Sequence, residues 1–132
     1  MSLPNGLEAI SGAHELHDWF GYWPSFHDAE IMRLDLNRHR SSTLFVHTWE
    51  MTDKIDGEGF YVLDKHVVVE FMLEDVSGLN LTGFNFQNVI FELSIEKKEE
   101  GFLLDLAPCY GLAGTIEAKN LSIRLHPGKP PE

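Results

Sequence analysis

Cysteine and positive charge are both scarce in this chain of 132 residues. The single cysteine, Cys109, cannot form an internal disulfide or a four-thiolate metal site. No apolar run approaches the roughly 18 residues that a transmembrane helix needs, and no basic segment followed by an apolar one marks a secretory signal. These absences predict a cytoplasmic protein without a membrane span.

The shortage of positive charge also restricts the partners. Only 10 Lys and Arg oppose 21 Asp and Glu, which gives a net charge of −11. Nucleic acids and anionic lipid surfaces are poor partners for such a chain, because their binding depends on Lys and Arg. A basic protein partner is favoured, since complementary charge speeds encounter and narrows partner choice. The acids are spread evenly: residues 1–66 hold 11 acids and 5 bases, and residues 67–132 hold 10 and 5.

The patterning of apolar residues predicts a mainly β domain. A short helix is expected from Ser11 to Phe20, capped by Ser11 and ended by Gly21. Alternating or β-branched runs then predict about seven strands, separated by a polar turn at 52–59, a charged turn at 97–101 and a loop at 108–114. These strands are expected at residues 32–36, 44–51, 66–73, 79–86, 88–96, 102–106 and 115–125.

The order of these elements favours one antiparallel sheet. Parallel strands need helical crossovers, and the sequence shows no long helical segment between the strands. A sandwich, a curved sheet and a partly open barrel all remain compatible with the pattern. We expect a single domain over residues 1–132, with a core at about 7–125 and a flexible Pro-rich tail at 126–132. Exposed sheet edges would also allow two copies to form a homodimer.

Motifs that would identify an enzyme are weak or absent. The pair His14 and His17 is spaced i, i+3, whereas zinc proteases place two histidines at i, i+4. Asp53 and Asp56 do not fit the spacing of a calcium loop. Cys109 has no basic neighbour in sequence that would activate it as a nucleophile. We therefore expect neither catalysis nor a cofactor.

Metal binding is the alternative function that the sequence leaves open. His27, Asp28 and Glu30 lie close together in the sequence, and imidazole and carboxylate groups at short range bind zinc. A small-molecule site is a further alternative, and it would require an apolar cavity inside the sheet.

An aromatic cluster precedes the first predicted strand. Phe20, Tyr22, Trp23 and Phe26 fall within seven positions. Their simplest role is to pack the N-terminal helix onto the sheet. An exposed Trp23 would instead be an interface anchor, because tryptophan dominates binding hot spots.

Four segments together resemble a known family: WPSFHDAEI at 23–31, HTWEMT at 47–52, GFNFQNV at 83–89 and YGLAG at 110–114. In this order and spacing they are similar to the polymorphic-toxin immunity protein family 50, from about residue 20 to residue 125. The resemblance implies a small, mostly β, cytoplasmic bacterial protein that binds and neutralises a cognate toxin, without turnover and without a cofactor.

The resemblance supplies no binding residues, so candidates come from the acidity and the aromatic cluster. An inhibitor of a basic toxin is expected to present carboxylates on neighbouring strands or loops; Asp35 is one such acid. The predicted partner-binding residues are Trp23, His27, Asp28, Glu30, Asp53, Asp56 and Glu58.

Overall fold

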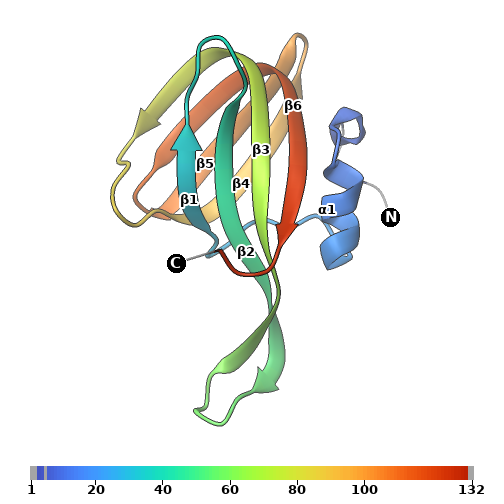
Figure 1. The fold of residues 1–132 in the computed structure, drawn as a ribbon, viewed down its shortest axis with the longest axis vertical. Coiled ribbons are helices and arrows are strands. Elements are labelled where there is room, and N and C mark those ends of the chain that lie inside the picture. Colours follow the sequence, from blue (N-terminus) through green and yellow to red (C-terminus); the bar gives the residue numbers. More distant parts are fainter. Residues whose placement is uncertain (1–2, 5, 131–132) are drawn as a thin grey trace.

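Six antiparallel strands form a closed barrel in the computed structural model, which describes residues 3–4 and 6–130. The strands follow one another around the barrel in the order β1-β2-β3-β6-β5-β4 (Figure 1). The mainly β, antiparallel architecture with a short N-terminal helix is confirmed, and the sheet closes on itself. The strands are β1 (Glu30–Asp35), β2 (Ser42–Ile55), β3 (Tyr61–Thr82), β4 (Val89–Lys98), β5 (Gly101–Tyr110) and β6 (Ala113–Pro127).

The described chain has six strands where about seven are expected, because β3 contains all of the predicted run at 66–73 and the first half of the run at 79–86, through Thr82. A register shift between Val76 and Gly78, next to Asp75 with φ 54°, bends this strand without ending it. Pairing with β6 continues on both sides of the bend, from Val67↔Pro127 to Thr82↔Ala113. The glycine therefore marks a β-bulge.

Two predicted loops are shorter in the structure. β2 continues to Ile55, so the first half of the expected turn at 52–59 is strand. β5 and β6 leave only residues 111–112 of the expected loop at 108–114. The tail expected at 126–132 also starts later, because β6 runs to Pro127 and the Gly128 N–H donates to the His66 carbonyl at 2.7 Å. Residues 131–132 of that tail lie outside the described part.

The helix α1 (Ala13–Phe20) begins two residues after the predicted cap and follows a 3-10 turn, η1 (Leu7–Ala9). Ser11 does not cap it; the Ser11 carbonyl instead accepts the Ile123 N–H at 2.7 Å and attaches the segment to β6. Gly12 has φ 90°, and a Cβ there would lie 1.8 Å from the Ile123 carbonyl oxygen. Gly21 ends the helix as predicted. Within the described residues, no helix is both long and apolar enough to cross a membrane.

Alternating side chains fill the interior of the barrel. On β3, Val67, Val69, Phe71 and Leu73 are buried, and most of the intervening positions face outward. The chain leaving α1 passes beneath the barrel toward β1 (Figure 1). Phe26 on this segment is 2% exposed, and its ring meets that of Phe71 edge-on at 5.7 Å. Packed side chains thus fill the interior of the described barrel, and a filled core counts against the small-molecule site, which required an apolar cavity inside the sheet.

The barrel closes along a short seam between β1 and β4. Strand pairing joins them only at Glu30↔Val89 in the described chain, but backbone hydrogen bonds continue outside the strands. The Asp28 N–H donates to the Ile90 carbonyl at 2.8 Å, and the Ile90 N–H donates to the Ala29 carbonyl at 2.9 Å. Residues 25–31, within the WPSFHDAEI segment, therefore complete the sheet.

Asn88 ties two loops together beside this seam. Its side chain is buried, and its Oδ1 accepts the N–H groups of Asn85 and Leu112 at 3.1 and 2.9 Å. Its Nδ2 donates to the Asn85 carbonyl at 2.8 Å. Gly111 must be glycine at this contact, because a Cβ would lie 2.5 Å from Asn88 Oδ1. One amide thus fixes the β3–β4 loop to the β5–β6 turn.

We expect Asn88→Ala to lower the free energy of unfolding by about 1–3 kcal/mol for each buried backbone group left without a partner. Urea denaturation measures this loss. Asn120→Ala, at an exposed position on β6, is the control and should change stability by no more than about 0.5 kcal/mol. Equal effects of the two substitutions would show that the amide does not hold the loops.

Candidate partner-binding surface

The hairpin between β2 and β3 extends beyond the barrel (Figure 1). We call residues 50–64 the arm. Its strands pair through Glu50↔Asp64, Met51↔Leu63 and Ile55↔Tyr61. Register shifts on both sides of Glu50 and Met51 accompany the point where the ribbon leaves the sheet. The arm is therefore a twisted two-stranded ribbon continuous with the barrel wall.

The tip of the arm is organised by Asp56. Its Oδ1 accepts the N–H groups of Glu58 and Phe60 at 2.8 and 3.1 Å. The Asp56 N–H also donates to the Phe60 carbonyl at 2.8 Å, and Gly59 has φ 88°. Asp56 thus forms the turn that presents its neighbours, while Asp53 and Glu58 are exposed beside it.

Large apolar side chains are exposed along the arm. Phe60 is 66% exposed and Ile55 63% exposed, which is far more than a core residue of a stable domain shows. A two-stranded ribbon has no second layer to cover its faces, and an isolated one is only marginally stable in water. The exposed apolar residues of the arm are Met51, Ile55, Phe60, Tyr61 and Leu63.

Negative charge accompanies this apolar surface. Within residues 50–64, five acids oppose one base, Lys54, so the arm contributes −4 to the net charge of −11. The acids are Glu50, Asp53, Asp56, Glu58 and Asp64. The arm therefore combines apolar contact area with a strong negative field, a combination that the even spread of acids in the sequence did not predict.

The base of the arm is anchored to the helix. Trp19 Nε1 donates to the Lys65 carbonyl at 2.9 Å, and Lys65 Nζ lies 3.5 Å from Glu50 Oε2. Lys65 has φ 52°, which turns the chain at this point. Burial, and secondarily the nearby Glu50 carboxylate, raise the pKa of Tyr22. These contacts hold the arm in a defined direction.

The turn before β1 lies against the arm. Phe26 and Asp28 both adopt left-handed backbone, with φ 65° and 68°, which is uncommon for non-glycine residues. His27 and Asp28 are exposed, with Nδ1 and Oδ2 3.3 Å apart. Both line a groove of about 200 Å³ whose other wall includes Trp49 and Met51 of β2.

The predicted site residues therefore fall into separate groups. Asp53, Asp56 and Glu58 lie on the arm, and the groove brings His27 and Asp28 to its base. Trp23 is half-buried against the core, as its packing role predicts. Glu30 lies on β1 opposite His47, away from the arm tip. Sequence reasoning missed the apolar half of the arm, because residues 52–59 have the composition of a solvated turn.

A pair of imidazoles on the outer wall was also missed. His47 Nε2 and His66 Nδ1 lie 3.1 Å apart, and the rings stack at 5.3 Å beside Trp49. Burial, followed by the neighbouring His66, lowers the pKa of His47. Burial, followed by Lys129, lowers the pKa of His66, while Asp64 acts in the opposite direction. The contact joins β2 and β3 where the arm leaves the barrel.

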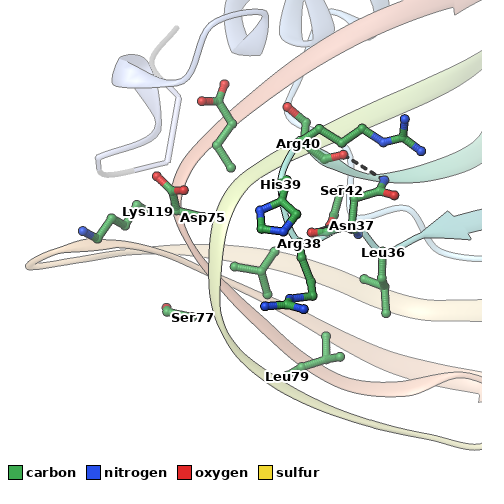
Figure 2. Close-up of a pocket in the computed structure, with 13 residues that line it drawn as sticks. Leu36, Asn37, Arg38, His39, Arg40, Ser42, Asp75, Ser77, Leu79 and Lys119 are labelled. Carbon is green, nitrogen blue, oxygen red and sulfur yellow. Dashed lines mark hydrogen bonds between the residues drawn. The ribbon is translucent and has the colours of Figure 1, made fainter.

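A second hollow lies at the opposite end of the β1–β2 hairpin. It encloses about 1190 Å³ between the turn at 36–42 and the bend of β3 (Figure 2). Arg38 and Arg40 extend from the turn in different directions, and Lys119 comes from β6. Glu74 and Asp75 line the same hollow. Its mixed charge suits a polar contact rather than an apolar ligand.

Comparison with known proteins identifies a family for this chain. A family model described as Immunity protein 50 matches residues 12–125. The matched region contains all four segments that carried the resemblance in the sequence. No curated protein and no solved structure matches the chain.

The imidazole pair predicts loss of stability in acid. Because the folded state lowers the pKa of His47 and His66 below the ordinary 6.5, the unfolded chain binds protons first as the pH falls. The contribution of the two imidazoles to the free energy of unfolding is fully present above about pH 6.5. It is lost as the pH falls from there through their lowered pKa values in the folded state. Urea midpoints at pH 7.5 and 5.5 should differ less in His47→Gln than in the unmodified protein. The control His39→Gln, at an exposed turn position, should show the same difference in urea midpoint between the two pH values as the unmodified protein. If His47→Gln also showed that same difference, the acid sensitivity would not come from the imidazole pair.

Proposed function

The chain belongs to the immunity protein 50 family, and on this premise we propose that it binds a cognate protein toxin and neutralises it by occupying the toxin surface. Immunity proteins of this kind act by binding and not by turnover. The complex, once formed, would itself prevent the toxin from acting.

The arm is the observation that carries this proposal. It exposes five large apolar side chains on a ribbon that the barrel does not cover. Such a surface is costly in water and is typical of a protein–protein interface. A partner that enclosed both faces of the ribbon would remove this cost, which supports the arm as the part inserted into the toxin.

The two kinds of side chain on the arm would act at different stages of binding. Phe60, Tyr61 and Ile55 would provide affinity, because buried aromatic and large aliphatic groups dominate hot spots. Asp53 and Glu58 would accelerate encounter with a basic toxin, since rim charges act mainly on the association rate. Asp56 would contribute indirectly by holding the turn.

The remaining predicted residues extend the proposed interface toward the barrel. His27 and Asp28 border the groove at the base of the arm, where a partner side chain could enter. Trp23 would support this turn from beneath, and Glu30 would lie at the periphery. A toxin that acts on nucleic acid has a basic substrate-binding surface. An arm of net charge −4 would compete for that surface in place of phosphate groups.

We expect Phe60→Ser combined with Tyr61→Ser to weaken toxin binding by at least about 30-fold, because hot-spot truncation costs about 2 kcal/mol or more. The toxin to be used is the toxic domain encoded next to this chain, measured by calorimetry and by rescue of cells that co-express it. Phe86→Ser is the matched control, since Phe86 is 94% exposed but lies outside the arm. Equal losses in the arm variant and the control would place the interface elsewhere.

Removal of negative charge from the arm should distinguish electrostatic acceleration of toxin association from direct contacts in the bound complex. Asp53→Asn with Glu58→Gln should slow association several-fold at low salt and much less at high salt, while dissociation changes little. Glu99→Gln with Glu100→Gln removes the same charge from the β4–β5 turn and is the control. A similar decrease in both double variants would indicate steering by net charge alone.

A homodimer formed through the arm is the competing possibility. It would appear as a concentration-dependent mass in sedimentation without toxin. Loss of that dimer in Phe60→Ser would count against toxin capture by the arm.

A further inference from the structure

Three potential metal ligands meet on the outer wall of the barrel, next to the β1–β4 seam. His27 and Asp28 precede β1, and Cys109 lies near the end of β5. One ligand atom from each side chain lies within 4.8 Å of the other two, and all three residues are exposed. The sequence alone does not pair Cys109 with these ligands, because it lies 81 positions after Asp28.

The main chain of β4 holds the two segments together. The Asp28 N–H donates to the Ile90 carbonyl at 2.8 Å, and the Cys109 thiol donates to the same oxygen at 3.6 Å. Their side chains are therefore neighbours because the sheet closes there. The proximity is part of the fold and does not depend on a chance contact between long, mobile side chains.

Backbone strain directs the imidazole to this place. Phe26 and Asp28 both have left-handed backbone, which is unfavourable for residues other than glycine. Burial of Phe26 inside the barrel holds this turn, so His27 between them points outward. The edge of Phe91 lies against the His27 ring, with centroids 5.3 Å apart, and further limits its orientation. Strained backbone of this kind is frequent at functional sites.

From this arrangement we propose that His27, Asp28 and Cys109 bind a zinc ion. Imidazole, carboxylate and thiolate are zinc donors, whereas magnesium and calcium require a shell of oxygens. His27 Nδ1 and Asp28 Oδ2 are 3.3 Å apart, close to the separation of two donors at about 2.0–2.1 Å on one tetrahedral zinc. The thiol loses its proton to solvent on binding. Thiolate and carboxylate then balance the charge of the ion.

The proposed ion would have two consequences for the molecule. It would link the segment before β1 to β5 across β4, at a seam where β1 and β4 share one strand pair. Binding only the folded state, it would stabilise the closed barrel. Three protein ligands leave a fourth position for water or a donor from another molecule. This inference concerns the isolated protein and does not depend on toxin binding.

Cobalt(II) tests the site directly, because thiolate coordination gives an intense charge-transfer absorption in the near ultraviolet. We expect this band when untagged protein is titrated with cobalt chloride, and its loss when zinc chloride is added. Cys109→Ser should abolish the band, and His27→Gln should weaken cobalt binding by at least about tenfold. His14→Gln, at an exposed position on α1, is the control and should bind cobalt normally.

Thermal stability supplies the second measurement. Zinc at a large excess over its dissociation constant should raise the Tm of the unmodified protein by several degrees. The same addition should leave the Tm of Cys109→Ser unchanged, and circular dichroism would verify that this variant is folded. Absence of the charge-transfer band would overturn the proposal. So would a zinc-dependent rise in Tm that is equal in the unmodified protein and in Cys109→Ser.

Discussion

Closure of the barrel between β1 and β4 is the constraint on which the other features of the molecule depend. These strands share one ladder pair, and the irregular segment before β1 supplies the remaining hydrogen bonds to β4. Phe26 secures that segment by filling the end of the barrel. The same turn forms one wall of the groove at the base of the arm and places His27 beside Asp28. Packing inside the barrel and surface chemistry outside it therefore have a common origin.

The arm follows from unequal strand lengths. β2 and β3 have 14 and 22 residues, while β1 has 6, so the β2–β3 ladder continues where no neighbouring strand can follow. Contacts from Trp19 to the Lys65 carbonyl and from Lys65 to Glu50 fix the base. The ribbon thus retains a defined direction although its apolar residues are uncovered. Such preorganisation reduces the entropy lost when a partner binds.

The sequence was informative where local pattern decides structure. Alternation located the β segments, Gly21 marked the helix end, and the four family segments indicated a family that the comparison confirms. Local pattern failed where tertiary pairing decides. The runs at 66–73 and 79–86 were expected to be separate strands, but the continuous partner β6 carries β3 from the first into the second through the bulge at Gly78. Cys109 and Asp28 are far apart in the chain, and only barrel closure brings them together.

The residues of the candidate surface could likewise be predicted only in part. The acids of the arm could be chosen from composition, because negative charge at 53, 56 and 58 is visible in the sequence. Their apolar companions could not be chosen, since exposure of Phe60 or Ile55 depends on the absence of a covering layer. The stacked His47 and His66 depend on strand register, which a single sequence does not specify.

The pairing of β3 with β6 has a consequence for how the protein is made. The arm is a local hairpin that can form soon after residue 64 leaves the ribosome, but β3 acquires its second neighbour only when residues 113–127 have been synthesised. Barrels built on such distant pairings fold in about milliseconds to seconds, much more slowly than hairpins. During translation the long edge of β3 is therefore open to other chains. A truncated product that ends before residue 113 would keep the exposed apolar side chains of the arm but would lack the closed barrel that orients the arm.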